Sequence, residues 1–507
     1  MKHGSRTEYS MRNISVSSAV RIITIVLGYV TRMVFTRMLS QHYLGVSGLF
    51  LEFFKLLSLS ELGIGIAITY ALYKPIAEGD EEKQKSVMDL YRRFYNRVAL
   101  FILVIGLLIL PFLDVLIKGQ HEVEDLQWIY LLYLANSVVS YLFVYKKTLI
   151  DAHQQMYVSM LHYGVFMTLQ YTLQIVILVC TGNFILYLVA YLLCTLLHNL
   201  AISRKAERMY PYLRGKKAAP LSDEERQDIG KNIKAMFMHK LGTVTVHNTD
   251  SLLISSMIGI VATACYANYR LIIGSVQQVL NQAFLGMSAS IGNLGAVEDN
   301  RKLNSVFESV FFIDCWLYGF VAVCLFVLLE TFVALSFGTQ YVFSADITFI
   351  LCLNFYMNGI RQAVLSFRDS LGLFWYDRYK SIAEAVVNLA ASIALAFFFG
   401  TSGIFWGTFV STVLVPLWVE PYILYKHQMK QPLLRYFAKL GMYTAAVFLG
   451  GIATYCICSH IEGGYVRQLF LKLPVCALVP NVLILLFFHR TAEFQHISDK
   501  VKSVLRR

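Results

Sequence analysis

Charged residues are scarce in this sequence of 507 residues. Asp, Glu, Lys and Arg together make up 15% of it, while hydrophobic residues make up 57%. A soluble globular protein carries about 25% charged residues. The shortage of charge therefore excludes an ordinary soluble domain, and the mean hydropathy of +0.57 agrees with that exclusion.

The sequence also lacks the motifs of common soluble enzymes. It has no P-loop, no H-E-x-x-H and no G-x-S-x-G. Its nine cysteines lie mostly inside apolar runs, without the spacing of a zinc site or a disulfide framework. The alternating strands of a membrane β-barrel are missing as well. We therefore expect neither an enzyme nor a bound cofactor.

Apolar runs of about 20 residues recur instead along the whole chain, which is typical of transmembrane helices. They predict an all-α polytopic membrane protein with about fourteen transmembrane helices. The first run contains arginines and is followed by no cleavage site, so we expect it to stay as a helix rather than be removed as a signal peptide. The predicted helices span 14–39, 43–73, 91–117, 127–149, 156–180, 183–202, 235–258, 262–290, 305–336, 344–366, 378–400, 402–425, 434–458 and 466–489.

Positive residues fall in alternate loops between these helices. If the N-terminus is cytoplasmic, most of the 44 Lys and Arg lie on the cytoplasmic side, as the positive-inside rule requires. An even number of helices then places the C-terminus in the cytoplasm too. Membrane topology thus explains the net charge of +12, and we expect no nucleic-acid partner.

The two halves of the chain resemble each other at an offset of about 218 residues, which indicates parallel repeats. Asn136 then aligns with Asn354, and Gly182 with Gly400. We predict an N-terminal six-helix bundle at 1–203, a cytoplasmic linker at 204–234, a C-terminal six-helix bundle at 235–430, and two further helices with a basic cytoplasmic tail at 431–507. Ser222 and Glu225 form the pattern of a capping box, so a short helix is expected in the linker.

The helix predicted at 14–39 carries Arg21, Arg32 and Arg37. An arginine in the middle of a bilayer costs about 2.5–3.5 kcal/mol, so it must face protein or water or reach the interface. Arg21 and Arg32 are spaced to share one helix face. Arg37 lies near the helix end, where we expect it to snorkel. We interpret the face of Arg21 and Arg32 as the lining of a cationic cavity.

Four further charged residues lie at a depth similar to that of Arg32: Glu52, Lys55, Asp250 and Arg270. Glu52 and Lys55, spaced i,i+3, either neutralise each other or contribute to the cavity. Asp250 is either a coupling residue or a counter-ion for an arginine. Because arginine binds phosphate oxygens in a bidentate manner, we predict that Arg21, Arg32, Lys55 and Arg270 bind a phosphate-bearing amphiphile.

The run Val26-Leu27-Gly28-Tyr29-Val30-Thr31-Arg32, followed by Leu44-Gly45-Val46-Ser47-Gly48, resembles the opening of the multidrug/oligosaccharidyl-lipid/polysaccharide (MOP) exporter superfamily. The chain is most similar to its polysaccharide transporter branch, the Wzx-type flippases of O-antigen and capsule repeat units. The resemblance implies a transporter in the bacterial cytoplasmic (inner) membrane. It would flip undecaprenyl-pyrophosphate-linked oligosaccharide by alternating access, alongside polysaccharide polymerase partners.

The resemblance also implies residue roles. The lipid II flippase of the superfamily binds pyrophosphate through arginines of its helices 1 and 8, which Arg32 and Arg270 match, and Lys55 is the nearest match to a helix 2 arginine. Asp250, with Glu52, is our candidate for coupling to protons or Na⁺. The alternative function is a cation-coupled multidrug antiporter of the same fold. A membrane-embedded glycosyltransferase or polymerase is disfavoured because every predicted outside loop is short.

Overall fold

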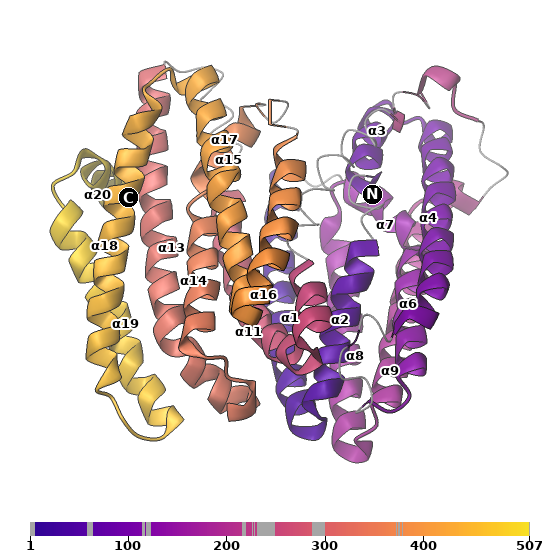
Figure 1. The fold of residues 1–507 in the computed structure, drawn as a ribbon. Helices are drawn as coiled ribbons and strands as arrows, with labels where there is room; N and C mark the ends of the chain where they lie inside the picture. The colour runs from indigo at the N-terminus through magenta and orange to yellow at the C-terminus, as the bar shows by residue number, and fades with distance from the viewer. Residues whose placement is uncertain are drawn as a thin grey trace. The chain divides into compact units, whose positions relative to one another are not determined.

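The structure, a computed structural model, describes residues 6–57, 64–113, 117, 123–214, 220–225, 227, 229–230, 249–285, 300–371, 373, 376–377 and 379–505. Within these ranges the regular elements are all helices, which confirms the predicted all-α fold class. The chain divides into two compact units, Met1–Ala264 and Cys265–Arg507 (Figure 1). The domain bounds proposed from the sequence remain a prediction, and part of the proposed linker and most of the helix at 235–258 lie outside the described residues.

The N-terminal unit contains helices of very different length. They are α1 (Arg6–Met38), α2 (Gln41–Leu57), α3 (Ile64–Glu78), α4 (Glu81–Ile109), η2 (Leu110–Phe112), α6 (Leu126–Tyr141), η4 (Val144–Lys146), α7 (Lys147–Ala152), α8 (Met156–Thr181), α9 (Phe184–Met209), η5 (Pro211–Arg214) and the π-helical turn η6 (Ile254–Ile258). The predicted helix 43–73 falls on α2 and α3, with 58–63 outside the described residues, and the predicted helix 127–149 is divided among α6, η4 and α7.

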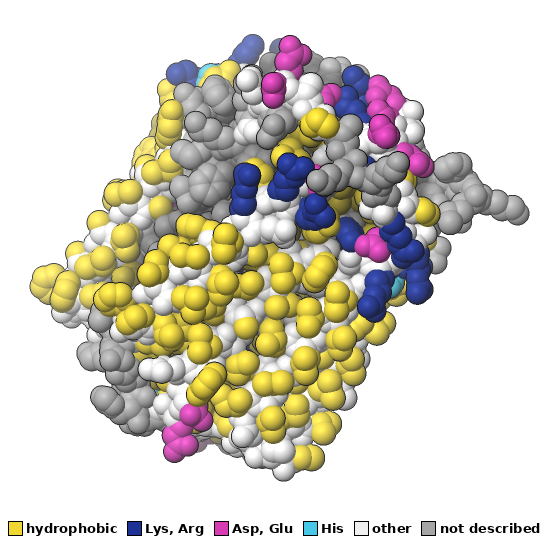
Figure 2. Space-filling model, turned by 90° about the vertical axis from the view of Figure 1, so that its right-hand side faces the viewer, with side chains coloured by type: hydrophobic (Ala, Val, Ile, Leu, Met, Phe, Trp, Pro, Cys, Tyr) yellow, Lys and Arg dark blue, Asp and Glu magenta, His cyan; other side chains and the backbone are white. Residues whose placement is uncertain are grey.

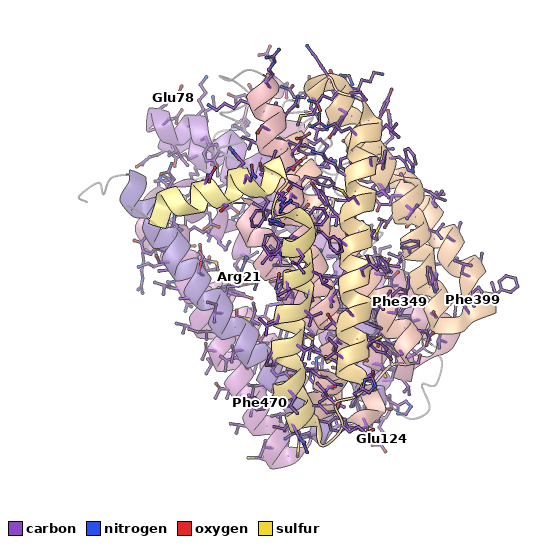
Figure 3. The ribbon with its side chains drawn as sticks, turned by 90° about the vertical axis from the view of Figure 1, so that its left-hand side faces the viewer. Arg21, Glu78, Glu124, Phe349, Phe399 and Phe470 are labelled. Atoms are coloured by element: carbon purple, nitrogen blue, oxygen red, sulfur yellow. The ribbon has the colours of Figure 1, made fainter. Side chains whose placement is uncertain are left out.

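The C-terminal unit begins within α11 (Ile260–Leu285). It continues with α13 (Asn300–Phe337), η7 (Thr339–Tyr341), α14 (Ala345–Gly359), α15 (Gln362–Ser370), α16 (Lys380–Leu414), α17 (Pro416–Leu424), η9 (Tyr425–Met429), α18 (Leu433–Ser459), α19 (Tyr465–Phe488) and α20 (Ala492–Leu505). The sequence predicted only a basic tail after residue 489, whereas α20 is a helix that contacts α13 and runs at a steep angle to α19 (Figure 3).

The described residues form nine helical segments that are long and apolar enough to cross a membrane. Their outward faces are apolar, as on the side of the N-terminal unit that carries α4, where hydrophobic side chains form a broad surface with Lys and Arg gathered beyond it (Figure 2). On α4 itself, Arg92 and Arg93 near its start are exposed, and Leu100, Leu107 and Leu108 further along are exposed as well. An exposed apolar face of this size is expected where lipid replaces water. The chain is thus a multi-pass membrane protein.

In the N-terminal unit α1 packs along α8, α8 packs on α9, and α9 packs on α6. The contact between α1 and α8 depends on small residues, as membrane helix packing commonly does. A Cβ placed on Gly164 would come within 2.9 Å of Val20, and one on Gly28 within 3.2 Å of the Tyr171 hydroxyl. These glycines therefore allow the arginine-bearing helix to approach α8 closely.

The sequence repeat aligned one pair of glycines and one pair of asparagines between the two halves, and the structure can be compared at both pairs. Gly182 joins α8 to α9 with φ of +61°, and Gly400 makes a kink inside α16 with φ of +58°. Both values lie in the left-handed region that favours glycine. Asn136 in α6 and Asn354 in α14 are each 8% exposed. The two units therefore share a glycine with positive φ and a buried asparagine at the aligned positions, although ψ is 9° at Gly182 and −132° at Gly400.

The two halves of α16 form a tight hairpin around Gly400. Cβ atoms on Gly403 and Gly407 would lie 2.1 Å from the Leu395 carbonyl oxygen and 2.3 Å from the Ser392 hydroxyl. Ser392 donates a hydrogen bond to the Ile404 carbonyl at 3.0 Å. Small residues and short polar side chains thus join the two halves where lipid offers no hydrogen-bond partner.

The capping box predicted in the linker is present. The Glu225 amide donates to the Ser222 hydroxyl at 3.3 Å, and the Ser222 amide donates to the Glu225 carboxylate at 3.3 Å. Glu225 also forms an ion pair with Lys83 of α4, and the hydrogen bond from that ammonium lowers the pKa of the Glu225 carboxyl. The linker is therefore attached to α4 at this point.

We expect Gly359→Ala to lower the thermal stability of the protein. The new methyl group would lie 2.0 Å from Cδ1 of Tyr318, a fully buried side chain of α13, and such overpacking costs about 1–3 kcal/mol. The melting temperature in detergent, read from the folded fraction on size-exclusion chromatography after heating, measures the effect. The control is Gly441→Ala in α18, which meets no atom within 4 Å. Equal melting temperatures for both variants would contradict the contact.

Candidate functional site

Arg32 of α1 lies among tyrosines of three other helices in the N-terminal unit. The side chain is half-buried, and its positive charge is within electrostatic range of the hydroxyls of Tyr133 in α6, Tyr171 in α8 and Tyr187 in α9. Arg32 thus lies beside phenols of three neighbouring helices, and its role as a binding residue stays a prediction.

These tyrosines belong to a larger group that we call the tyrosine cluster. It consists of Tyr133, Tyr163, Tyr171, Tyr187 and Tyr191, whose hydroxyls interact electrostatically with one another. Tyr133 is buried and shares a hydrogen bond of 2.7 Å with Ser47 of α2, whereas the other four are partly exposed. The cluster thus combines one buried phenol with four that are partly accessible at the surface of the unit.

Aromatic rings pack next to the cluster where α1 ends and α9 begins. The ring of Phe35 lies 5.3 Å from that of Phe184 and 5.5 Å from that of Tyr187, in edge-to-face arrangements. Tyr43 of α2 adds a contact of 5.4 Å with Phe184. This packing fixes the end of α1 one helical turn beyond Arg32 and so holds the guanidinium in place.

Arg21 lies on the same helix and also faces α8. It is exposed, it is labelled in Figure 3, and its charge is within electrostatic range of Tyr163. Tyr163 and Tyr171 lie on α8 and face Arg21 and Arg32, respectively. Both arginines thus lie near tyrosines of α8, and the cationic cavity that they were predicted to line stays a prediction.

Glu52 and Lys55 of α2 are joined by the local ion pair that their spacing allows. The Lys55 ammonium lies 2.8 Å from the Glu52 carboxylate, with the lysine side chain 61% exposed and the glutamate side chain 10% exposed. The charge of Lys55 is therefore largely compensated inside its own helix. A role for either residue in binding or coupling remains a prediction.

Asp250 and Arg270 belong to different units. Asp250 is 6% exposed and lies just before η6 in the N-terminal unit, and Arg270 is half-buried on α11 in the C-terminal unit. On α11 the neighbouring Tyr269 hydroxyl accepts a hydrogen bond of 3.0 Å from the Phe343 amide. The binding role of Arg270 and the coupling role of Asp250 both stay predictions.

Sequence reasoning missed the tyrosine cluster, although its signal is present in the residue spacing. Tyr187 and Tyr191 are four residues apart and Tyr163 and Tyr171 are eight apart, so each pair lies on one helix face. A guanidinium next to phenols can bind phosphate oxygens, while the rings can stack on sugars. Among the described residues no group of His, Cys, Asp and Glu is arranged to hold a metal ion.

The C-terminal unit holds a second group of charges, which sequence reasoning left unassigned. Arg361 makes a bidentate pair with Glu420 at 2.7 and 3.0 Å, and Glu420 is fully buried. Lys380 also pairs with Glu420, and Arg368 pairs with Asp377. We call this group the ion cluster; its members are Arg361, Arg368, Lys380, Asp369, Asp377, Glu384 and Glu420. It joins the region of α15 to α16 and α17.

Comparisons with known proteins found similarity in structure alone. No family model matches the chain, and no curated protein matches it. Lipid II flippase MurJ, in an inward closed conformation, matches with a TM-score of 0.66 and 12% identity, over 93% of this chain and 98% of MurJ. The chain has the MOP transporter fold.

Two multidrug transporters of this fold match as well. An inward-facing MATE family transporter of the MOP superfamily has a TM-score of 0.62 and 16% identity, over 80% of this chain and 97% of its own. A Vibrio cholerae MATE transporter has a TM-score of 0.54 and 15% identity, over 84% and 98%. At these sequence identities the similarity establishes the fold, with its two lobes. The substrate has to be inferred from the residues of the site.

We expect Glu420→Gln to destabilise the protein strongly. The substitution removes the nearest carboxylate of the buried Arg361 and Lys380, which keep only longer contacts with Glu384 and Asp377, and breaking a buried ion pair costs about 3–5 kcal/mol. The control is Asp89→Asn, which breaks exposed pairs with Arg92 and Arg93 worth at most about 1 kcal/mol. Melting temperatures in detergent compare the two, and a smaller loss for Glu420→Gln than for Asp89→Asn would refute a stabilising ion cluster.

Proposed function

We propose that this chain flips an undecaprenyl-pyrophosphate-linked oligosaccharide, a polysaccharide repeat unit, across the bacterial cytoplasmic membrane by alternating access. The observation that carries the proposal is Arg32, a half-buried guanidinium set among the phenols of the tyrosine cluster. The likeness to a lipid II flippase supports a lipid-linked substrate. In this proposal the protein is a Wzx-type flippase rather than an enzyme, with both termini cytoplasmic and a polysaccharide polymerase as a partner.

The site suits such a substrate in two parts. Arg32, with Arg21 on the same face of α1, supplies positive charge for the pyrophosphate. The partly exposed rings of Tyr163, Tyr171, Tyr187 and Tyr191 supply flat apolar faces and hydroxyls for sugars. Lys55 and Arg270 are proposed to add charge for the pyrophosphate. Arg21 and Arg32 favour an anionic substrate over the cationic drugs of a multidrug antiporter.

We expect Arg32→Ala to slow clearance of lipid-linked repeat units from the cytoplasmic leaflet by roughly 10- to 100-fold, because the bidentate contact with phosphate is lost. Arg32→Lys should keep part of the rate, since lysine acts as a point charge. The measurement is the amount of cytoplasm-facing repeat units in a deletion strain that carries each variant. Immunoblots of membranes correct for protein level.

The matched control for this experiment is Arg37→Ala. Arg37 is an exposed arginine of the same helix, five residues beyond Arg32. It should leave clearance unchanged. Normal clearance by Arg32→Ala at a normal protein level would refute pyrophosphate capture, whereas an equal defect in both variants would show that α1 needs positive charge in general rather than at this site.

Asp250, with Glu52 as the second candidate, is proposed to couple transport to protons or Na⁺. Asp250 is 6% exposed, and burial makes the protonation state of a carboxyl sensitive to its surroundings. We expect Asp250→Asn to flatten the dependence of transport rate on pH, measured in proteoliposomes. Asp89→Asn on the exposed part of α4 is the control. A pH profile for Asp250→Asn that matches the unaltered protein would remove Asp250 from this role.

A further inference from the structure

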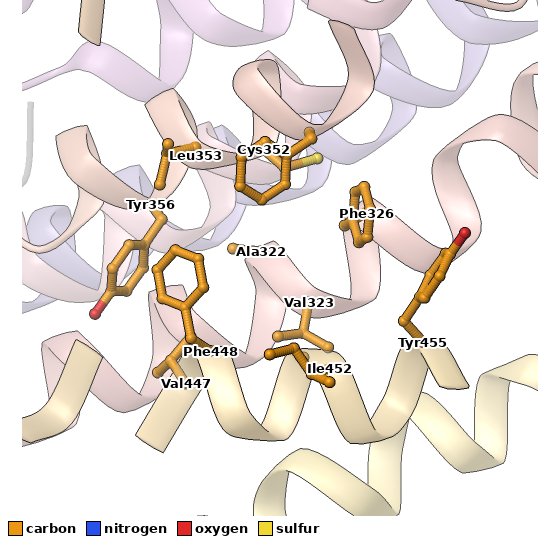
Figure 4. A pocket seen from close by; sticks show the side chains of 12 residues that line it. Ala322, Val323, Phe326, Cys352, Leu353, Tyr356, Val447, Phe448, Ile452 and Tyr455 are labelled. Atoms are coloured by element: carbon orange, nitrogen blue, oxygen red, sulfur yellow. The ribbon is translucent and has the colours of Figure 1, made fainter. Parts of the chain in front are cut away.

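A long apolar groove runs along the C-terminal unit between α14 and α18, with α13 as its floor (Figure 4). Its volume is about 340 Å³. Five aromatic rings line it, from Phe326, Phe349, Tyr356, Phe448 and Tyr455. The remaining lining is small or aliphatic, including Gly451 on α18 and Ala322 on α13. A groove of this shape and chemistry accepts a hydrocarbon chain.

A polar pocket of about 310 Å³ continues the groove at the end where α18 leads into α19. The two share Phe326 and Tyr455 as lining residues, so they form one site. The pocket is lined by hydroxyls of Thr331, Thr348 and Ser459 and by two charged side chains, Glu330 of α13 and Lys472 of α19. The site thus has an apolar part and a polar part that carries both signs of charge.

The dimensions match one leaflet of a bilayer. The part of α18 along the groove extends from Val447 to Tyr455, a rise of about 12 Å at 1.5 Å per residue. Half of the hydrocarbon core of a bilayer is about 15 Å thick. A polar group in the pocket therefore lies at the level of the headgroups while an acyl chain fills the groove.

The two charges in the pocket select the headgroup. The Lys472 ammonium donates a hydrogen bond of 2.9 Å to the Gln468 side chain, and in the described part of the chain it has no carboxylate within 4 Å. Glu330 is exposed on α13. A headgroup that carries both a phosphate and an ammonium satisfies Lys472 and Glu330 together, whereas a purely anionic one would leave Glu330 opposite negative charge.

We infer that this groove and pocket form a binding site for one zwitterionic phospholipid of the phosphatidylethanolamine type. Its phosphate contacts Lys472, its ammonium contacts Glu330, and one acyl chain lies between α14 and α18. The bound acyl chain fills the groove that α13, α14 and α18 leave between them. It thereby stabilises the C-terminal unit. The inference concerns a resident lipid and is independent of the proposed transport substrate.

Native mass spectrometry of the delipidated full chain tests the site, with phosphatidylethanolamine and phosphatidylglycerol of equal chain length as probes. We expect one tightly bound phosphatidylethanolamine, held several-fold more tightly than phosphatidylglycerol. Glu330→Gln should abolish this preference. Lys472→Ala and Gly451→Leu should each weaken phosphatidylethanolamine binding by about 5-fold or more, the first by removing the phosphate contact and the second by filling the groove.

Two control variants should bind like the unaltered protein. Arg467→Ala removes a cation from α19 that does not line the pocket, and Leu449→Phe adds bulk on an exposed face of α18 outside the groove. The inference is overturned if Glu330→Gln keeps the preference or if Gly451→Leu binds normally. It is also overturned if undecaprenyl phosphate displaces the phospholipid, because the groove would then hold a prenyl chain.

Discussion

A guanidinium in an apolar chain is the constraint on which this structure depends. An arginine exposed to hydrocarbon is too costly to keep, so Arg32 requires a polar surrounding that the rest of the N-terminal unit has to build. The fold does so by packing α1 on α8 through Gly28 and Gly164, which brings the tyrosines of α8 and α9 to the arginine. The close packing of α1 on α8 and the polar surroundings of Arg32 therefore depend on each other.

The two units surround arginine with different chemistry. Arg361 in the C-terminal unit is held by the carboxylates of Glu420 and Glu384, at 2.7 and 3.6 Å, in a fully packed environment. Arg32 in the N-terminal unit is half-buried beside phenols. A bidentate carboxylate pair locks an arginine to its neighbours, and an anionic ligand would have to compete with that pair. The phenols near Arg32 are neutral groups whose hydroxyl oxygens can accept hydrogen bonds from a guanidinium.

Much of the fold could be predicted from the sequence, because its determinants are local. Apolar runs gave the positions of α1, α8, α9, α18 and α19 to within a few residues, apart from the N-terminal extension of α1 and the C-terminal extension of α9. The repeat aligned Gly182 with Gly400, and both glycines have positive φ. The break at Leu142–Phe143 inside the predicted helix 127–149 was missed. Hydropathy continues across that break, so composition carries little signal for it.

The candidate site was less predictable, because it depends on contacts between helices far apart in sequence. Arg32 stands out in the sequence because a charged side chain inside a membrane helix carries a high free-energy cost. Its tyrosines do not, since a tyrosine in a membrane helix is common at interfaces and in cores. Likewise Glu420 and Arg361 are 59 residues apart, and only the fold shows that they pair. Isolated charges are therefore visible in a sequence, while their partners need coordinates.

Charged residues that stabilise the fold differ in their surroundings from charged residues that can bind a ligand. Where buried charges are matched within the chain, as at Glu420, nothing remains for a ligand to contribute. Where charged side chains border apolar surface, an amphiphile can contact both kinds of surface at once. Arg32 beside the rings of the tyrosine cluster borders apolar surface, and so do Lys472 and Glu330 at the end of the groove between α14 and α18. Both sites therefore suit amphiphiles, which is what a bilayer supplies.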